Sequence, residues 1–499
     1  MADDLLTLAE QNRTEALASL DAATQSTLGQ FFTPARAAAL IASIPRLPEC
    51  GQVRLLDPGA GSGMLSAALV ARILTERPNL SVHVVAVECD HLVGPYLRKT
   101  LEACSSADSG RVTFDIIEGD FIMAATGLGS DPRLVEHDLV LQNPPYAKLA
   151  ASSMHRVAVR KAGVDAPNLY AAFLALGAAA LKQRGQLVAI TPRSFCNGPY
   201  FGAFRSYLLD HITLDRVHVF ESRSTVFAET GVLQENVIFS GTRGGAQSSV
   251  MLSVSNGHED DATLRTVEYR DVVLPDDPHR FIRIAVNEDD IETAEVMLAL
   301  PCTLKELAIE VSTGRVVDFR SRTALLAEPT PNAHPLIYPG NLRGGGFEWP
   351  RQGIRKAQWF APVETKDKEL LLPEGWYCVV KRFSAKEERR RIVASAWSPR
   401  EVPGHVAFEN HLNVFHVKGG GLDEETARGL TVWMNSTLID RFFRMFSGHT
   451  QVNATDLRSM RFPTRDALRR LGQSANSLAS QAEVDQLVSA VLTESRAVE

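Results

Sequence analysis

The sequence predicts an α/β protein in which a doubly wound sheet is followed by a second, mixed α/β domain. Over roughly the first half of the chain, apolar runs of strand length alternate with helical patterns, which is typical of a largely parallel sheet covered by helices. The full length of 499 residues exceeds what one hydrophobic core usually serves. We therefore expect at least two domains, and we expect ligands of the first to bind at the carboxyl ends of its strands.

The first strand-to-helix connection is rich in glycine. A strand-like run ends in Asp57-Pro58-Gly59-Ala60-Gly61-Ser62-Gly63, and a helical pattern follows over 64–74. Glycines let the backbone approach a ligand closely, and the start of the next helix offers unpaired N–H groups. The glycine spacing is not that of the dinucleotide fingerprint, and the lysine of a phosphate-binding loop is absent. Phosphate is therefore not the favoured ligand, and Asp57 is placed to meet a hydroxyl or ammonium group.

Two further strand-like runs end in acidic residues. The run 82–87 leads to Glu88, and the run 112–117 leads to Asp120 and Phe121. An acidic residue at the end of the second strand is the usual partner of ribose hydroxyls, so Glu88 indicates a ligand that carries an adenosine. Asp120 would then accept a hydrogen bond from the adenine amino group, and Phe121 would pack on the purine face.

A fourth strand-like run, 138–142, is followed by Asn143-Pro144-Pro145-Tyr146. Asn143 offers an amide oxygen and Pro144 keeps a carbonyl without an N–H, so the loop presents two acceptors and few donors. Two such acceptors would hold both hydrogens of an exocyclic amino group on an aromatic ring and make its nitrogen a better nucleophile. Tyr146 would stack on that ring. For these four residues alone, an ordinary proline-rich turn is the alternative interpretation.

The alternating pattern continues beyond this loop. Residues 168–182 indicate a long apolar helix, 185–192 a turn and strand, 202–209 a helix and 232–239 a terminal strand of the same sheet.

These motifs, in this order, resemble the S-adenosylmethionine-dependent amino-methyltransferases, and within them the gamma-class N6-adenine DNA methyltransferases of type II modification systems. The stretch Gln30-Phe31-Phe32-Thr33-Pro34 resembles the motif that precedes the glycine loop in this class. The resemblance implies a Rossmann-like methyltransferase sheet, S-adenosyl-L-methionine as cofactor, and methyl transfer to N6 of an adenine flipped out of double-stranded DNA. It leaves room for a separate cognate restriction endonuclease as a further partner.

The resemblance also implies roles for single residues. The cofactor contacts would be Thr33, Pro34, Asp57, Gly59, Gly61, Glu88, Asp120, Phe121, Asn143 and Pro145. The catalytic loop would be Asn143, Pro144, Pro145 and Tyr146. Phe201 would hold the opposite face of the flipped base, although a core phenylalanine that opens the helix 202–209 is an equal alternative. No strong general base is obligatory, because positive charge leaves the sulfonium as the new N–C bond forms.

Composition suggests how the chain is divided. We expect a catalytic, cofactor-binding domain over 1–245, a polar boundary region over 246–264, a target-recognition domain over 265–465 and a C-terminal helical segment over 466–499. The stretch 447–463 resembles the target-recognition end of type II adenine methylases. Its candidates for contact with DNA are Gln451, Asn453, Arg458 and Arg461, because Arg, Asn and Gln can read base edges.

A net charge of −7 does not favour binding to nucleic acid, but the charges are unevenly distributed. Acidic residues gather at 259–261 and 288–290, whereas basic residues gather in the C-terminal half. The basic run 386–391 is interpreted as a solvated face, with a DNA-facing surface as the alternative.

Membrane and metal functions are not expected. No apolar run is long enough to span a bilayer, and the acidic start of the chain is unlike a signal peptide. Six cysteines show no paired metal spacing, so we expect no metal site and a cytoplasmic location.

Other functions stay open from the sequence. A protein glutamine N5-methyltransferase uses the same tetrapeptide but does not need the long C-terminal region. N4-cytosine DNA methylation uses similar chemistry, although its enzymes favour Ser over Asn at the first position. A catalytically idle DNA-binding subunit is disfavoured by the intact Asn143, Tyr146 and Glu88. A fused nuclease is disfavoured because Glu364-Thr365-Lys366 lacks an acidic partner nearby.

Overall fold

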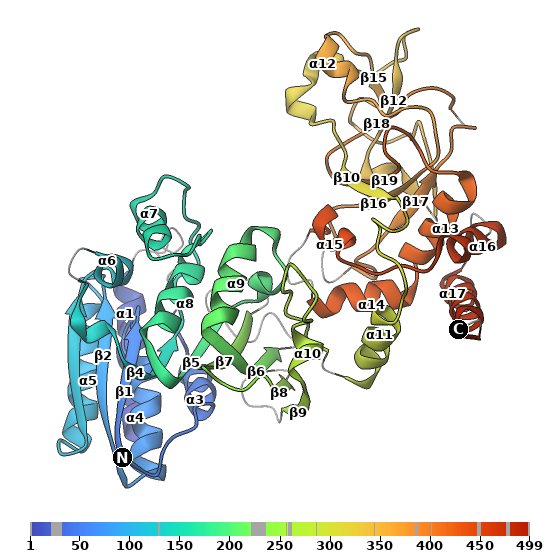
Figure 1. Cartoon of the computed structure of the whole chain (residues 1–499). Helices are drawn as coiled ribbons and strands as arrows, with labels where there is room; N and C mark the ends of the chain where they lie inside the picture. The colour runs from blue at the N-terminus through green and yellow to red at the C-terminus, as the bar shows by residue number, and fades with distance from the viewer. Residues whose placement is uncertain are drawn as a thin grey trace. The chain divides into compact units, whose positions relative to one another are not determined.

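The chain forms two compact units, Met1–Val286 and Asn287–Glu499 (Figure 1). The computed structural model describes residues 2–20, 32–127, 130–220, 236–255, 257, 262–285, 287–343, 345–384, 388–400, 402–446, 451–475 and 480–497. Each helix in this described part is too short or too polar to cross a bilayer.

The first unit is built on a nine-stranded sheet in the order β3-β2-β1-β4-β5-β7-β6-β8-β9. The strands are β1 (Cys50–Pro58), β2 (Asn79–Glu88), β3 (Val112–Glu118), β4 (His137–Gln142), β5 (Leu181–Pro192), β6 (Ile212–Phe220), β7 (Asn236–Arg243), β8 (Ser249–Ser255) and β9 (Thr263–Glu268). Strands β1 to β5 are parallel, and β7 is antiparallel to both of its neighbours. The strand order reverses between β1 and β4, which is where open α/β sheets bind ligands.

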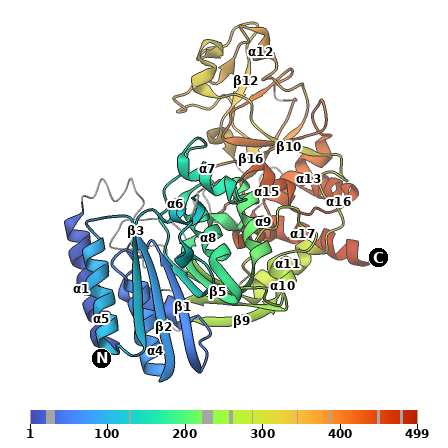
Figure 2. The same cartoon turned by 60° about the vertical axis from the view of Figure 1, so that its left-hand side comes forward.

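Helices cover both faces of this sheet (Figure 2). One face carries α1 (Ala2–Ser19), α3 (Ala35–Ser43), α4 (Met64–Glu76) and α5 (Gly94–Ala107). The other carries α6 (Phe121–Thr126), α7 (Met154–Lys161), α8 (Leu169–Ala180) and α9 (Gly202–His211). Successive strand residues point to opposite faces, so neighbours such as Leu55 and Leu56, or Val84 and Val85, enter different cores. This explains the continuous apolar runs within the central strands, such as Val84–Val87.

The second unit combines two four-stranded sheets and a hairpin with helices. One sheet has the order β10-β19-β16-β17, from β10 (Glu310–Thr313), β16 (Tyr377–Lys381), β17 (Ala394–Trp397) and β19 (Leu412–His416). The other is β11-β15-β12-β18, from β11 (Leu325–Leu326), β12 (His334–Ile337), β15 (Trp359–Phe360) and β18 (Ala407–Phe408), and the hairpin pairs β13 (Leu342–Arg343) with β14 (Gly346–Phe347). The helices include α11 (Glu288–Leu298), α12 (Thr365–Lys368), α13 (Glu424–Met434), α14 (Thr437–Phe446), α15 (Ala454–Arg458), α16 (Arg465–Ser474) and α17 (Gln481–Ala497).

The predicted fold class is confirmed, since a doubly wound sheet is joined to a mixed α/β unit. The division of the chain differs from the expected one. Residues 246–264 are no linker, because β8 and the start of β9 extend the first sheet there and the units divide after Val286. Polar and glycine residues suggested a boundary here, but residues 244–248 form the turn between β7 and β8, and 253–255 are the end of β8. The C-terminal segment 466–499 belongs to the second unit.

Two expected element boundaries also shift. The helix expected over 168–182 ends at Ala180, where β5 begins directly. Of the strand expected over 232–239, residues 232–235 lie outside the described residues and the remainder is the start of β7.

Candidate cofactor pocket and catalytic loop

A pocket lies at the carboxyl ends of β1, β2 and β4 in the first unit. Its walls come from the glycine loop, the end of β2, the loop after β3, the catalytic-loop candidate after β4, and α8. The lining residues are Phe32, Thr33, Gly59, Ala60, Gly61, Met64, Leu65, Glu88, Cys89, Asp120, Asn143, Pro145, His155, Leu169 and Phe173. Most of the cofactor contacts expected from the sequence therefore meet at one place. Gln30 and Phe31 lie outside the described residues, and Pro34 precedes α3 as its N-cap.

The glycine loop after β1 is tied to the neighbouring strand. The amides of Gly59 and Ala60 both donate to the Val87 carbonyl at 2.9 Å. Gly61 has a φ of 56°, and a Cβ there would lie 3.1 Å from the Phe32 ring. Glycine is required at this position for both its left-handed conformation and the space it leaves.

Glu88 forms the β2 side of the pocket and is held by backbone donors. Its Oε2 accepts from the Gly61 amide at 2.8 Å and its Oε1 from the Asp90 amide at 2.8 Å. Burial raises the pKa of this carboxyl group above its ordinary value. Each carboxylate oxygen has a second lone pair, so the fixed group can still accept from a ligand hydroxyl.

Asp57 does not line the pocket but lies beneath the loop. Its side chain is 1% exposed and accepts a hydrogen bond of 2.6 Å from the Ser66 hydroxyl in the first turn of α4. Burial raises the pKa of Asp57 to about 7. The sequence placed Asp57 against a ligand, whereas in the structure it joins β1 to α4 and supports the loop from below.

Asp120 is a pocket residue with two partners in the protein. It is the N-cap of α6, where its Oδ1 accepts from the Met123 amide at 2.9 Å. Its Oδ2 lies 2.9 Å from Nε2 of His155 on α7. His155 also lines the pocket and was not anticipated from the sequence.

The aromatic wall of the pocket is Phe173 rather than Phe121. Phe121 is 3% exposed, belongs to the core and is not among the lining residues. Phe173, on α8, packs against it with ring centroids 5.0 Å apart and faces the pocket. The signal for Phe173 was present in the sequence, because its i, i+4 spacing from Leu169 puts both residues on one helix face.

Asn143 stands at the end of β4 with its amide oriented by two neighbours. Its Nδ2 donates to the Thr33 hydroxyl at 3.0 Å, and its Oδ1 accepts from the Tyr146 hydroxyl at 3.2 Å. Pro144 is buried and Pro145 lines the pocket. The bond to Thr33 fixes the amide nitrogen as the donor on that side, and an amide oxygen can accept two hydrogen bonds.

Tyr146 and Phe201 are connected through a third aromatic ring. Tyr170 lies edge-on to Tyr146 with centroids 6.2 Å apart and stacks on Phe201 at 5.5 Å. Tyr170 itself is buried, with its hydroxyl 2.9 Å from Ser194 Oγ. Phe201 is half-buried, packs on the core and precedes α9 as its N-cap, which agrees with the interpretation as a core residue, while its contact with a base stays a prediction.

In the second unit, the four candidates for DNA contact have structural partners. Arg458 donates to the Val311 carbonyl at 2.8 Å and Arg461 to the Leu300 carbonyl at 2.7 Å, yet both residues stay exposed. Asn453 caps α15 in a capping box with Asp456, and Gln451 accepts from Arg382 at 3.3 Å. Residues 447–450 of the same stretch lie outside the described residues.

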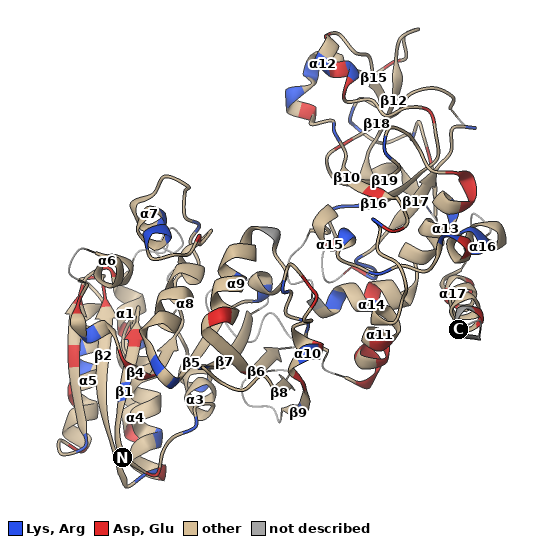
Figure 3. Ribbon diagram, viewed as in Figure 1, with Lys and Arg blue, Asp and Glu red and all other residues tan. Residues whose placement is uncertain are grey.

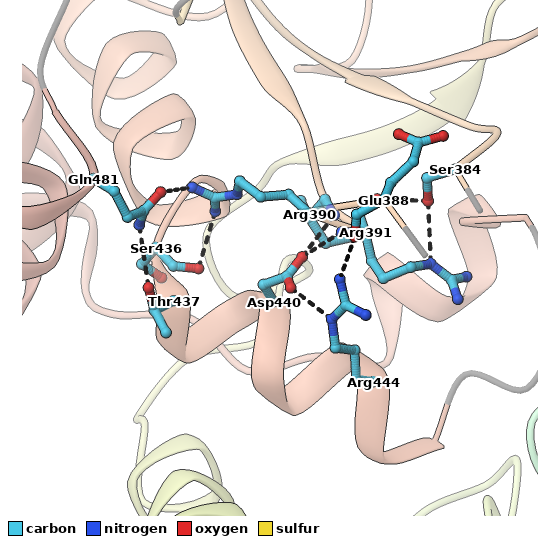
Figure 4. A network of polar contacts seen from close by, with 10 residues as sticks. Ser384, Glu388, Arg390, Arg391, Ser436, Thr437, Asp440, Arg444 and Gln481 are labelled. Atoms are coloured by element: carbon cyan, nitrogen blue, oxygen red, sulfur yellow. Dashed lines mark hydrogen bonds and ion pairs between the residues drawn. The ribbon is translucent and has the colours of Figure 1, made fainter. Parts of the chain in front are cut away.

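The basic run 386–391 is solvated in part of its described end (Figure 4): residues 388 and 389 are exposed, whereas Arg390 is half-buried and Arg391 is buried. Arg391 is 1% exposed, and its Nε donates to Ser384 Oγ at 3.1 Å. Asp440 on α14 accepts from the amide of Arg391 at 2.6 Å and from Arg444 at 2.8 Å. Arg390 bonds to Gln481 and to the Ser436 carbonyl. These arginines fasten a loop to α14 and α17 within the second unit.

The nuclease-like tripeptide has a local structural role. Glu364 is the N-cap of α12, and its Oε2 lies 2.8 Å from Nζ of Lys366. Among the residues that the structure describes, no group of three or more His, Cys, Asp or Glu side chains could hold a metal ion.

Comparison with known proteins agrees with this fold and site. A model of the Eco57I restriction-modification methylase family matches residues 133–227. The chain is 39% identical over 493 residues to the type II methyltransferase M.PstI of Providencia stuartii, covering 96% of each protein. It is 41% identical over 460 residues to the type II methyltransferase M.BsuBI of Bacillus subtilis, covering 90% of each.

Among solved structures, the type IIL restriction-modification enzyme MmeI in complex with DNA aligns with a TM-score of 0.54. The alignment covers 100% of this chain and 74% of that one, at 10% identity, so it supports the fold alone. Fold and pocket define an α/β enzyme of the methyltransferase class. The full-length identity to M.PstI and M.BsuBI goes further: the chain belongs to the type II methyltransferases of restriction-modification systems.

Proposed function

We propose that this chain transfers a methyl group from S-adenosyl-L-methionine to the N6 amino group of an adenine in double-stranded DNA. The observation that carries the proposal is the position of Asn143, whose oriented amide lies in the wall of the same pocket as Glu88. An acceptor for an amino group and a partner for a ribose thus share one cavity. The membership in the type II methyltransferases supports the reaction class.

The pocket residues fit the cofactor. Glu88 would accept from the ribose hydroxyls, and Phe173 would pack on the adenine. Asp120 would accept from the adenine amino group, sharing its Oδ2 with His155. The glycine loop, with its close backbone approach and Thr33 nearby, would receive the methionine end. When bound, S-adenosyl-L-methionine supplies a methyl group activated by the positive sulfonium.

The catalytic loop would prepare the nucleophile. Asn143 Oδ1 and the Pro144 carbonyl would each accept one N6 hydrogen, which directs the nitrogen lone pair toward the methyl carbon. Tyr146 would stack on the base, with Phe201 as a further aromatic contact. The base must leave the duplex to reach this loop, which costs about a few kcal/mol. Alignment and charge placement then account for the catalysis, so no strong general base is needed.

We place DNA sequence recognition in the second unit, whose mixed α/β architecture is separate from the pocket. Gln451, Asn453 and Arg461 remain the proposed residues for recognition there, and Arg458 remains a proposed contact with DNA. A separate cognate restriction endonuclease is a proposed partner, in line with the restriction-modification class. Protein glutamine methylation is the weaker alternative, because the chain matches type II methyltransferases over nearly its whole length.

Sequencing that detects modified bases tests this function directly. DNA from cells that express the chain should carry N6-methyladenine at one short sequence, whereas DNA from cells expressing the Asn143→Ala variant should not. N4-methylcytosine at one sequence would instead support the related cytosine chemistry. If the cells contain the folded protein and their DNA is still unmodified, the proposal is contradicted.

A further inference from the structure

We propose that a basic hollow in the second unit binds the phosphodiester backbone of DNA. The hollow is lined by residues 303–305 and 308–312 together with Arg315, His416, Lys418 and Arg458. It lies along β10, the edge strand of its sheet, beside α15. The inference rests on the proposed DNA substrate, and it names a surface that would hold that substrate outside the catalytic pocket.

The charge of the hollow is strongly positive for a chain with a net charge of −7. Four exposed cations line it, namely Lys305, Arg315, Lys418 and Arg458. The acidic residue of the lining is Glu310, which is exposed and lies 3.9 Å from His416. A concave surface with this excess of cations attracts a polyanion.

Lys305 adjoins the exposed Glu306 and interacts with its charge, but none of the four cations forms a close ion pair with a described carboxylate. Elsewhere in the same unit, Arg343 faces Glu348 and Arg469 faces Asp423. A cation outside an ion pair can bind an external anion directly. A cation in an ion pair must first break its contact with the carboxylate.

The two arginines are held in place by the protein backbone. Arg458 donates from Nη2 to the Val311 carbonyl, and Arg315 donates from Nη1 to the Glu369 carbonyl at 2.8 Å. A guanidinium has several N–H donors, so each arginine keeps donors for a phosphate oxygen. Backbone anchoring on one side reduces the side-chain entropy that binding would cost.

This placement changes the role expected for Arg458. The sequence suggested a base-edge contact, which would discriminate between sequences at one position. A cation that shares one hollow with three other cations is better suited to bind phosphate groups. The phosphate groups are the same whatever the base sequence of the duplex. Arg458 would therefore contribute to affinity for all sequences and not to the choice among them.

The test compares salt dependence in full-length variants. Lys305→Ala/Lys418→Ala removes two cations from the hollow, and Lys366→Ala/Lys368→Ala removes two exposed lysines of α12 as the matched control. The binding of a duplex without target sites is measured by fluorescence anisotropy over a range of salt concentrations. We expect the hollow variant to lower the slope of log Kd against log salt by about two and to weaken binding about tenfold or more at low salt, with an unchanged slope for the control.

Arg458→Ala adds a second readout. It should weaken target and non-target duplexes by the same factor and reduce the salt slope by about one. A loss confined to target duplexes would overturn the phosphate assignment. Equal slopes in the hollow variant, the α12 control and wild type would also overturn it while leaving the proposed function intact. Absence of DNA binding by the wild-type chain would instead refute the proposed function and this inference together.

Discussion

His155 Nε2 lies 2.9 Å from Asp120 Oδ2 and joins the segment after the catalytic loop to the cofactor pocket. This segment is closed at its base, where the Leu149 amide donates to the Pro167 carbonyl at 3.1 Å and the Leu169 amide to the Ala147 carbonyl at 2.9 Å. The contact therefore links the proposed adenine-binding carboxylate to α7, which lies in the segment between Tyr146 and α8.

Replacing Asp120 by Asn separates its two roles. The Asn side chain still caps α6 through its amide oxygen, but an NH2 group replaces Oδ2, so the adenine amino group would meet a donor where it had an acceptor. We expect about tenfold weaker S-adenosylmethionine binding by calorimetry with less than about 1 kcal/mol lost in stability. Asp131→Asn, the same change at the N-cap of the 3-10 turn Pro132–Leu134, is the control and should leave affinity unchanged. A similar loss in both variants would argue against a cofactor role for Asp120.

The two packed phenylalanines should respond differently to truncation. Phe173→Leu removes a pocket wall, so we expect about three- to tenfold weaker cofactor binding, the value of one aromatic contact. Phe121→Leu leaves the wall in place and should lower the free energy of unfolding by about 1–2 kcal/mol without changing affinity. If only the Phe121 variant binds the cofactor more weakly, Phe121 would pack on the purine, as the sequence suggested.

Asp57 should make stability depend on pH. Its pKa is raised from 3.8 to about 7, so the folded protein binds a proton that the unfolded chain releases in this range. The contribution of this proton to the free energy of unfolding is fully present below about pH 4, and it is lost as the pH rises through about 7. Asp57→Asn keeps an acceptor for Ser66 without the charge. We measure the free energy of unfolding in urea from pH 4 to pH 8. Between these two pH values the stability of the variant relative to wild type should rise by about a few kcal/mol, as expected for a pKa shift of this size. A difference that stays constant over this range would rule out titration of Asp57.

The sequence was a good guide to the strand ends. Glu88 and Asn143 follow apolar strands with clear local patterns, and parallel strands bring their carboxyl ends to one sheet edge, so their meeting in one pocket could be predicted. Local patterns could not show which face of a loop turns inward. Asp57 is covered by the loop that it supports, and Phe121 packs behind Phe173.

Long-range contacts were equally invisible in the sequence. His155 reaches Asp120 across 35 positions, and the burial of Arg391 depends on Asp440, which follows 49 positions later. The turn between β7 and β8 resembled a linker because turns and linkers share a polar, glycine-containing composition. In each case the deciding information lies in the tertiary packing rather than in local propensity.

Asp440 supplies a prediction for the second unit (Figure 4). It accepts from the amides of Arg391 and Ile392 and from Arg444 Nε, so Asp440→Asn weakens three hydrogen bonds and leaves buried donors poorly matched. We expect a loss of about 1–3 kcal/mol in denaturant unfolding. Asp289→Asn, at the exposed ion pair with Arg441, should change stability by less than about 0.5 kcal/mol. Equal effects of the two changes would show that burial of Asp440 has no energetic consequence.

Figure 3 shows that acidic positions line α11, whereas basic positions lie beside α15. The net charge of the chain therefore does not describe its local surfaces, which is why DNA affinity is expected despite the value of −7.

The proposed chemistry depends most on Asn143, and methyl transfer by purified protein tests it. Labelled S-adenosylmethionine and duplex DNA that contains the modified sequence are incubated with wild type, with Asn143→Ala and with the control Asn79→Ala. The control changes an exposed residue at the start of β2, and the pocket lies at the other end of that strand. We expect Asn143→Ala to retain its unfolding midpoint and cofactor affinity within about threefold but to lose transfer by a factor of about a hundred or more, because it removes an acceptor that acts on the reacting amino group. Asn79→Ala should transfer methyl groups at the wild-type rate. Near wild-type turnover by a folded Asn143→Ala variant would contradict the assignment of this loop as the catalytic site.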